Sequence, residues 1–535
     1  MKKLPLGIQN FREIITGDYV YVDKTQYIYN LIRGAKYYFL SRPRRFGKSL
    51  LLDTIGEVLK GEKELFKGLW IYDSDYEFKK YPVIRLDMSN ISNSTPMVLE
   101  AALLDDLRII IEDEELNIPG DNPSSVFKRL IRGLKMKYDQ RIVILIDEYD
   151  KPILDHLNDI KTSEANRNVL RDFYGILKSM DPYICFTFIT GVTKFTKTSI
   201  FSGLNNLFDI TLAEDYANIC GIPTESLNEY FGLHIENLST HNNFKQYKSV
   251  SDEILAWYDG YSWDGRLRLL NPFSLLNFFE LKKFESFWYS SGTPWFLIEM
   301  IKKKPESFLT LKNLEISEWI LDAFNIQRIE AEPLLFQTGY LTVKDVIQTK
   351  GSPIYVLDIP NFEVRNAFNA QIVSVLTESG DVHTGRAQME ISRALESGDL
   401  KKMLDILRGL FASIPYNLHV DLEAYYHSIF YAVMTLLGFD MDVEVSVSKG
   451  RVDAVLELPD KVYIMEFKYS KCPHETNAED KRRLFDTALK AAMDQINDRG
   501  YSAKYQGSGK AIYQAAFAFL GRDNIELLVE NIKTT

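Results

Sequence analysis

The sequence predicts a multidomain α/β protein, and three observations support this fold class. The chain has 535 residues, which is too many for one ordinary hydrophobic core, so two to four domains are expected. In the first part of the chain, short apolar segments alternate with helical patterns, which is typical of a parallel sheet flanked by helices. A second alternation of helix and strand patterns follows residue 410. We therefore expect two α/β domains joined by a mainly helical connector.

Short, β-rich segments supply the strands of the first expected sheet, at residues 37–41, 82–89, 141–147 and 183–190. The segments RIVILID (141–147) and YICFTFIT (183–190) lack polar alternation, which indicates strands buried on both faces. Helical patterns lie between these strands. One of them, residues 49–60, carries its apolar side chains on one side, as expected for a helix packed on a sheet.

The pattern changes twice after the first sheet. From about residue 225 to 345 it becomes mainly helical, and residues 385–410 form an amphipathic helical stretch, so we place a domain boundary near 370–410. The expected parts are a first α/β domain (1–220), a helical connector (221–370), a helical linker (371–410) and a second α/β domain (411–535).

Composition excludes several classes of protein. The formal net charge is -11, which argues against a surface coated with basic residues for nucleic acid, although a local basic patch remains compatible with it. The three cysteines (Cys185, Cys220 and Cys472) form no CxxC pair, so neither a disulfide framework nor a cysteine zinc site is expected. No secretory signal and no run of about 18 apolar residues is present. We expect a soluble cytoplasmic protein without a membrane partner.

Residues 42–49 read RPRRFGKS, directly after the strand at 37–41 and before the helix at 49–60. A glycine-lysine-serine at a strand-to-helix junction is typical of a phosphate-binding loop, in which backbone N–H groups and the helix N-terminus hold the anion. Gly47 would belong to this loop, Lys48 would reach the β- and γ-phosphates of ATP, and Ser49 would ligate Mg²⁺.

The loop departs from the usual pattern because Arg42 stands where the first glycine is expected. Proline fixes its own φ angle, so Arg42 followed by Pro43 implies a stiffer loop entry with a different shape. We expect ATP binding to tolerate this change better than fast ATP hydrolysis does. Arg44 and Arg45 either contact phosphate or are solvated.

Acidic residues follow the apolar run at 142–146. Asp147 would hold Mg²⁺ through water, and Glu148 would orient or deprotonate the attacking water. On the strand that follows in the chain and just after it, Thr190 and Asn205 are candidates for sensing the γ-phosphate. Ordinary capping and turn roles for these two residues remain open.

A second set of charged residues lies in two strand patterns around a turn at Pro459 and Asp460. In the second strand, the two-residue period places Ile464, Glu466 and Lys468 on one face and Tyr463, Met465 and Phe467 on the other. Charged side chains among apolar neighbours are costly unless they are paired or bind a metal. In the first strand, Asp453 lies between two apolar residues.

Metal-assisted phosphodiester hydrolysis fits these residues. Asp453 and Glu466 would hold Mg²⁺ together with the main-chain carbonyl of Phe467, and Lys468 would position the water and stabilise negative charge. A cross-strand salt bridge on a solvated face is the alternative for Glu466 and Lys468.

Two neighbouring helical patterns add candidates. Glu423 and His427 lie one turn apart on one helix face. Glu423 could add a carboxylate to the metal site, whereas a histidine at such a place is more often a satisfied core or surface residue. Gln495 shares a face with Ala488 and Ala492 and could support the site, unless it is a surface residue.

The sequence resembles a bacterial family that pairs an N-terminal AAA-ATPase-like domain with a C-terminal nuclease-like domain of the PD-(D/E)xK superfamily. The resemblance covers nearly the whole chain and rests on YVDKT (21–25), RPRRFGKSLL (42–51), IDEYDKP (146–152), TGVTKFTKTSIFSGLNNL (190–207), WYDGY (257–261), LLFQTGYLT (334–342), PNFEVR (360–365), SIPY (413–416), GRVDAV (450–455) and EFK (466–468).

The resemblance implies a P-loop NTPase fold followed by a restriction-endonuclease-like fold. Members of the family also carry an arginine-proline loop, so Arg42 departs from ordinary P-loops but not from the family. The acid–acid-x-lysine core of the nuclease superfamily matches Asp453, Glu466 and Lys468. The acid of an N-terminal helix matches Glu423, and a glutamine of the following helix matches Gln495.

The expected function is ATP binding and hydrolysis by the first domain, coupled to a Mg²⁺-dependent nuclease domain that acts on DNA rather than RNA. Residues 411–535 carry 14 Lys and Arg against 18 Asp and Glu, so basic residues such as Lys449, Arg451 and Lys468 would have to attract DNA locally. Two alternatives stay open: a regulatory ATPase whose C-terminal domain binds nucleic acid without cutting, and a non-enzymatic nucleotide-switched assembly protein. A homo-oligomer also stays open.

Overall fold

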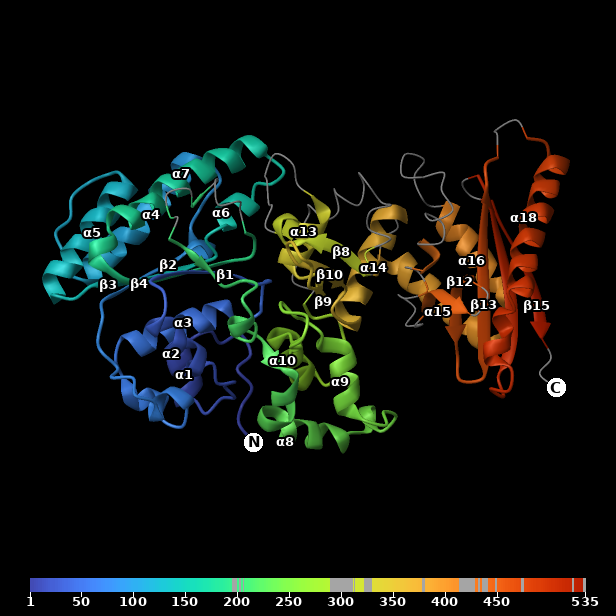
Figure 1. Cartoon of the computed structure of the whole chain (residues 1–535), viewed down its shortest axis with the longest axis horizontal. Coiled ribbons are helices and arrows are strands. Elements are labelled where there is room, and N and C mark those ends of the chain that lie inside the picture. The colour runs from blue at the N-terminus through green and yellow to red at the C-terminus, as the bar shows by residue number, and fades with distance from the viewer. Residues whose placement is uncertain are drawn as a thin grey trace. The chain divides into compact units, whose positions relative to one another are not determined.

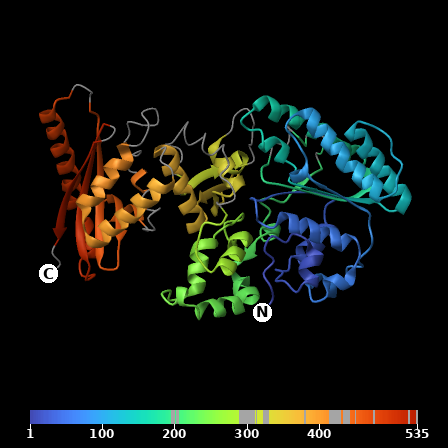
Figure 2. The same ribbon diagram turned by 180° about the vertical axis from the view of Figure 1, so that it is seen from behind.

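The chain divides into two compact units, which are described separately (Figures 1 and 2). Unit 1 comprises Met1–Ser291 and Lys312–Val364, and unit 2 comprises Gly292–Leu311 and Arg365–Thr535. The computed structural model describes residues 1–194, 200–201, 204, 206–288, 311, 313–321, 330–377, 381–412, 429–431, 434, 441–447, 450–472, 476–521 and 524–532. Among these residues, no helix is long and apolar enough to cross a membrane.

Unit 1 is built on a parallel sheet of five strands in the order β2-β3-β4-β1-β5. The strands are β1 (Tyr37–Ser41), β2 (Val83–Asp87), β3 (Ile142–Asp147), β4 (Ile184–Gly191) and β5 (Phe208–Asp209). Every residue of β3 is buried, and so is every residue of β4 except Cys185, as predicted from their apolar runs. Strand β1 is also buried throughout. The four strands predicted from the sequence are confirmed, and β5 is an addition that the sequence did not signal.

Helices cover both faces of this sheet (Figure 1). They are α1 (Phe11–Thr16), α2 (Thr25–Arg33), α3 (Lys48–Leu59), α4 (Pro96–Asp113), α5 (Pro123–Tyr138), α6 (Lys151–Leu154) and α7 (Ile160–Ser179). Helices α1–α3 lie on one side, and α4, α5 and α7 lie on the other. The N-termini of α4 and α5 follow from the sequence, because Thr95 and Asn122 cap them and a proline occupies the first turn of each.

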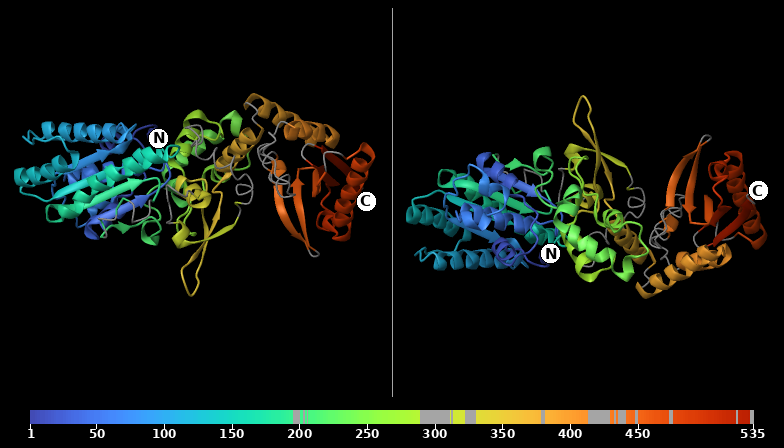
Figure 3. Two further views of the ribbon diagram at one scale, coloured as in Figure 1. Left: turned by 90° about the horizontal axis from the view of Figure 1, so that it is seen from above. Right: turned by 90° about the horizontal axis from the view of Figure 1, so that it is seen from below.

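The second half of unit 1 is mainly helical, as predicted, but it also contains strands. Its helices are α8 (Leu227–Ser239), α9 (Val250–Tyr258), α10 (Pro272–Leu281), α12 (Glu318–Leu321) and α13 (Ala331–Thr338). Its strands are β6 (Ile222–Pro223), β7 (Leu269–Leu270), β8 (Leu314–Ser317), β9 (Thr342–Ile347) and β10 (Ile354–Asp358). The last three form an antiparallel sheet in the order β8-β10-β9, and Figure 3 shows the β9–β10 hairpin projecting from unit 1.

Unit 2 is a five-stranded mixed sheet between helices. Its strands are β11 (Met441–Val447), β12 (Gly450–Glu457), β13 (Lys461–Ser470), β14 (Ala511–Leu520) and β15 (Asn524–Ile532), in chain order across the sheet. Its described helices are α14 (Phe362–Thr377), α15 (Asp381–Ser397), α16 (Leu400–Ala412) and α18 (Ala478–Asp498). The β12–β13 hairpin is confirmed at the predicted turn. The single amphipathic stretch expected at 385–410 is two helices, α15 and α16.

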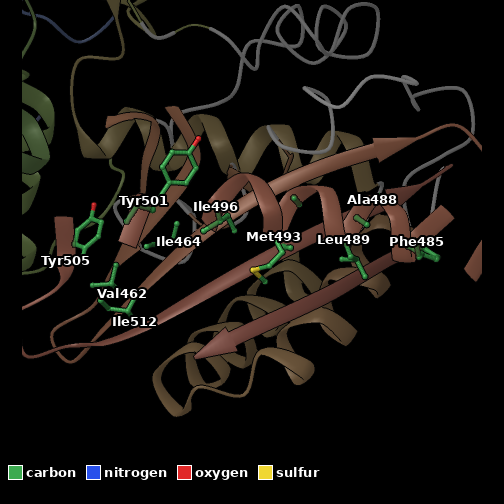
Figure 4. Close-up of a cluster of buried hydrophobic side chains, with 14 of the residues drawn as sticks. Val462, Ile464, Phe485, Ala488, Leu489, Met493, Ile496, Tyr501, Tyr505 and Ile512 are labelled. Carbon is green, nitrogen blue, oxygen red and sulfur yellow. The ribbon is translucent and has the colours of Figure 1, made fainter. Parts of the chain in front are cut away.

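The two faces of β13 carry different partners. Ile464 packs with Ala488, Ala492 and Ile496 of α18 in one hydrophobic cluster (Figure 4). On the opposite face, the hydroxyl of Tyr463 donates to the carbonyl of Leu395 in α15 at 2.8 Å. The predicted alternation of β13 is therefore confirmed, and α18 covers the face that also carries Glu466 and Lys468.

Replacement of Gly260 by alanine is expected to destabilise unit 1. Gly260 has a φ of +107°, and an added Cβ would lie 2.1 Å from the carbonyl oxygen of Pro360. A backbone atom cannot move aside as the end of a flexible side chain can. We therefore expect the free energy of unfolding, measured by chemical denaturation, to fall by about 3 kcal/mol or more. Gly68→Ala is the matched control, because Gly68 also has a positive φ (+85°) but no atom lies within 4 Å of its added Cβ. Equal losses in the two variants would contradict this prediction.

Candidate functional site

The loop from Arg42 to Gly47 joins β1 to α3 and surrounds the side chain of Lys48. Gly47 has a φ of +94° and precedes the first residue of α3. Lys48 is buried, and its Nζ donates to the carbonyl oxygens of Arg42 at 3.0 Å and Pro43 at 2.9 Å. The ammonium group is thus held over the interior of the loop, next to the N-terminus of a helix, where an anion is favoured. Ser49 is the second residue of α3 and half-buried.

Arg42 faces away from this interior. Its guanidinium is fully buried and donates to the carbonyl oxygens of Ser41 and Thr211, both at 2.8 Å. It also lies 4.0 Å from the ring centroid of Trp263. Burial lowers the pKa of Arg42 to about 10, so the group still carries its charge at neutral pH. The side chain that replaces the first glycine therefore anchors the loop entry to its surroundings.

Aromatic side chains from the second half of unit 1 hold the outer side of the same loop. The Phe46 ring contacts the rings of Tyr261 and Trp263 at centroid distances of 5.1 and 5.0 Å. The guanidinium of Arg45 lies 3.9 Å from the centroid of Phe273. The sequence indicated no such role for these aromatic residues, because contacts between distant segments have no local signal.

Trp288 adds a polar contact on the same side. Its indole N–H donates to the carbonyl oxygen of Arg44 at 3.3 Å. Arg44 itself is exposed. Both arginines predicted to contact phosphate are thus exposed, and Arg45 in addition stacks on the ring of Phe273.

The acidic side of this site lies at the carboxyl end of β3. Asp147 is buried, and its carboxylate accepts from the Thr190 hydroxyl at 2.5 Å and from the backbone N–H of Glu148 at 3.0 Å. Strand β4 lies between β1 and β3, so Thr190 at its end lies between the phosphate loop and Asp147. The structure brings these three features to one edge of the sheet. Asn205, the other predicted sensor, lies outside the described residues.

Glu148 combines an unusual backbone with a shifted pKa. Its φ is +49°, a conformation that non-glycine residues rarely adopt and that occurs at functional sites. Burial raises the pKa of its carboxyl group, and the nearby negative charge of Asp147 acts in the same direction. The positive charges of Lys48 and Arg44 oppose the rise. The charges of Lys48 and Arg44 therefore both act on Glu148.

Asp150 and Tyr149 have roles that the sequence analysis missed. Asp150 is buried and accepts from the backbone N–H groups of Val192 and Thr193 and from the Thr193 hydroxyl. The Tyr149 hydroxyl donates to the carbonyl of Thr193 at 3.0 Å. The motif that supplies Asp147 and Glu148 thus also fixes the chain that leaves β4. The second aspartate of this motif, three residues after Asp147, is the feature of the sequence that could have indicated this role.

These residues fit a nucleoside triphosphate with Mg²⁺. A helix N-terminus and the ammonium group of Lys48 suit phosphate oxygens, and the hydroxyl of Ser49 and the carboxylate of Asp147 are hard oxygen ligands of the kind that Mg²⁺ takes.

The second candidate site lies where strands β12 and β13 separate. Regular pairing between them is present from Ala454 with Met465 to Glu457 with Val462. One residue further on, side chains replace the ladder: the Asp453 carboxylate accepts from the N–H of Phe467 at 2.9 Å, and the Glu466 carboxylate accepts from the N–H of Asp453 at 3.4 Å. The two predicted acids therefore face each other across neighbouring strands.

Glu466 is the more perturbed of these acids. Its side chain is fully buried, and burial followed by the charge of Asp453 raises its pKa to about 7. Lys468 opposes this rise, since its Nζ lies 3.3 Å from the Glu466 carboxylate. A cross-strand pair on a solvated face was the alternative for Glu466 and Lys468, but the pair lies within one strand and its acid is buried.

These two acids fit a divalent metal, because a bound cation would offset both the burial of the Glu466 carboxylate and its repulsion by Asp453, which together raise the pKa of Glu466. Among the residues that the structure describes, no group of three or more His, Cys, Asp or Glu side chains is placed to hold a metal. Glu423, which the sequence suggests as a further carboxylate, and His427 lie outside those residues. Gln495 is half-buried on α18, and its main-chain carbonyl accepts from the main-chain N–H of Arg499 at 3.3 Å.

Two family models match the parts of the chain that contain the candidate sites. Residues 5–201 match the family model described as "Predicted AAA-ATPase", and residues 421–526 match that of the PD-(D/E)XK nuclease superfamily. The first match contains the phosphate loop and Asp147, and the second contains the hairpin with Asp453 and Glu466. The five-stranded parallel sheet fits a P-loop NTPase, and the mixed sheet of unit 2 fits the nuclease fold.

A curated relative matches the chain from end to end. It is the "Uncharacterized protein in vnfD 5′region" of Azotobacter chroococcum mcd 1, which is 34% identical over 540 residues that cover 99% of each chain. Taken with the two domain matches, this similarity shows that the chain belongs to the family in which an AAA-ATPase-like domain is followed by a PD-(D/E)XK nuclease-superfamily domain.

Proposed function

We propose that this protein binds and hydrolyses ATP in unit 1 and cleaves DNA with Mg²⁺ in unit 2, with the nucleotide state controlling cleavage. The observation that carries the nuclease half is the buried Glu466 carboxyl group opposite Asp453, with Lys468 at 3.3 Å. Buried like charges are costly, and they are retained in proteins mainly where a metal or a reaction uses them. DNA is proposed as the partner, in a cytoplasmic protein that could also assemble with copies of itself.

In unit 1, the proposed steps use groups that already lie together. Lys48 would exchange the carbonyl oxygens of Arg42 and Pro43 for the β- and γ-phosphates of ATP, and Mg²⁺ would neutralise phosphate charge next to Ser49 and Asp147. The raised pKa of Glu148 suits a group that accepts a proton from the attacking water. The Thr190 hydroxyl donates to Asp147, and we propose that it senses the γ-phosphate from this position.

In unit 2, Asp453 and Glu466 would hold Mg²⁺ together with the main-chain carbonyl of Phe467, with Glu423 as a further carboxylate and Gln495 in support. When bound, the metal would activate a water molecule and polarise the phosphate. Lys468 lies on the same strand face as Glu466 and would orient the water and stabilise the negative charge that develops on the phosphate.

Two other functions would give different results in the same experiments. A regulatory ATPase whose C-terminal domain only binds nucleic acid would turn over ATP without Mg²⁺-dependent cleavage. A nucleotide-switched assembly protein would bind ATP tightly, hydrolyse almost none, and change its oligomeric state when Lys48 is replaced.

Lys48→Ala is expected to weaken ATP binding by roughly thirtyfold, since charged hydrogen bonds to phosphate contribute about 2 kcal/mol. Equilibrium binding of a fluorescent ATP analogue measures this change. Lys60→Ala is the matched control, because Lys60 follows the other end of the same helix and pairs with Glu57. Glu148→Gln should keep binding and lose hydrolysis. An unchanged affinity of Lys48→Ala for the ATP analogue would contradict the assignment of residues 42–49 as a phosphate-binding loop.

Asp453→Ala is expected to lower Mg²⁺-dependent cleavage of labelled DNA by about 10²–10³-fold, because one of the two proposed metal-holding acids is lost. Asp460→Ala is the control at the turn of the same hairpin, where the carboxylate is exposed and pairs with Lys461. Cleavage that persists in Asp453→Ala would point to a contaminating nuclease or a misplaced site.

Metal affinity at this site should rise with pH and level off above about pH 7. The folded-state pKa of Glu466 is raised to about 7, so below that pH a proton competes with the metal. Mn²⁺ binding, followed by calorimetry, should weaken up to tenfold per unit of pH below about 7. In the metal-free chain, the protonated Glu466 carboxyl group contributes to the free energy of unfolding at low pH. This contribution is lost as the pH rises through about 7. Glu466→Gln should abolish both effects, and a pH-independent affinity in the wild-type chain would contradict the prediction.

A further inference from the structure

Arg499 lies at the end of α18, next to the candidate nuclease site. It is the C-terminal cap of this helix and is half-buried. The chain turns at Gly500 and continues into Tyr501, which is buried in the cluster between α18 and the sheet (Figure 4). One guanidinium nitrogen of Arg499 donates to the Tyr501 hydroxyl at 3.0 Å. A rigid, buried tyrosine therefore holds the arginine head group in place.

The bond to Tyr501 brings the Arg499 head group close to the strand that carries Glu466, because Tyr501 packs in one cluster with Ile464, two residues before Glu466 on the same strand face. The Tyr501 hydroxyl first, and then the negative charges of Glu466 and Asp453, raise the pKa of Arg499. The direction of this shift agrees with a cation near both acids. Helix α18 packs on the face of β13 that carries Glu466 and Lys468, so Arg499 belongs to the helix that faces these two residues.

The charge balance favours phosphate as the ligand of this cation. Residues 411–535 carry 14 Lys and Arg against 18 Asp and Glu, so nucleic acid must be attracted by cations close to the site. A planar guanidinium binds phosphate oxygens in a two-pronged geometry that a lysine cannot match. With five N–H donors, it can hold Tyr501 and still engage a phosphate.

We propose that Arg499, held by Tyr501, binds the phosphate of the nucleic acid that lies next to Asp453 and Glu466, and so positions the phosphodiester for cleavage. This inference rests on the proposed nuclease function and adds a substrate-contacting residue to it. Arg499 would also reduce the affinity of the empty site for a divalent metal, because it places positive charge near the two acids.

A purely structural role would behave differently. The backbone N–H of Arg499 bonds to Gln495 and would do so with any side chain. Loss of the guanidinium would then lower stability alone, leaving metal affinity and substrate binding unchanged.

The test compares the full-length chain with Arg499→Ala, Arg499→Lys and the control Arg482→Ala, whose arginine pairs with Asp486 near the start of the same helix. Three quantities are measured: Mn²⁺ affinity without DNA, affinity for a short labelled DNA duplex in Ca²⁺, and kcat and KM for its cleavage in Mg²⁺. We expect Arg499→Ala to bind Mn²⁺ about threefold more tightly, to bind the duplex about tenfold more weakly, and to lose about 10²-fold in kcat/KM. Arg499→Lys should recover part of the duplex affinity, and Arg482→Ala should match the wild type.

Two outcomes would overturn the proposal. One is a loss of stability with unchanged Mn²⁺ and duplex affinity, and the other is an equal loss in Arg482→Ala. If the wild-type chain binds the duplex in Ca²⁺ but does not cut it in Mg²⁺, the nuclease function fails by itself. Arg499 is then still judged by the difference in duplex affinity between Arg499→Ala and the wild type.

Discussion

The parallel pairing of β1 with β4 and of β4 with β3 is the constraint on which the site in unit 1 depends. Parallel strands present their carboxyl ends at one edge of a sheet, so the loop after β1, Thr190 near the end of β4 and Asp147 at the end of β3 meet there. Strands β1 and β3 are buried along their whole length, as expected for a parallel sheet with helices on both faces.

Both candidate sites keep carboxyl groups in buried surroundings and balance them with nearby cations. In unit 1, Lys48 and Arg44 oppose the rise in the pKa of Glu148. In unit 2, Lys468 does the same for Glu466. Such pairs are poor sources of stability, because desolvation offsets the attraction between the charges. Their presence in both sites, with one acid of each site raised above its usual pKa, favours the proposed chemistry on phosphate.

The unusual loop sequence RPRRFGKS has a structural explanation within unit 1. Arg42 replaces a flexible residue with a side chain that is buried against Trp263 and bonded to Ser41 and Thr211. Phe46 and the Arg44 carbonyl are held by further aromatic residues of the same half of unit 1. The shape of the phosphate loop thus depends on residues more than 200 positions away in the sequence, which explains why aromatic clusters accompany the loop in this chain.

The sequence by itself determined four of the five strands of the parallel sheet in unit 1, the β12–β13 hairpin of unit 2 and the charged residues that lie on or next to these strands. These features depend on local properties, namely apolar runs, a two-residue period and the residue types that a phosphate or a metal requires. Tertiary structure alone decided that Arg42 faces away from the phosphate side, that Asp150 fixes the end of β4, and that Tyr501 holds the guanidinium of Arg499. Each of these depends on which distant segments pack together, and packing between distant segments leaves no periodic signal in the chain. The same reason explains why the β8-β10-β9 sheet was missed within a region whose local pattern is mainly helical.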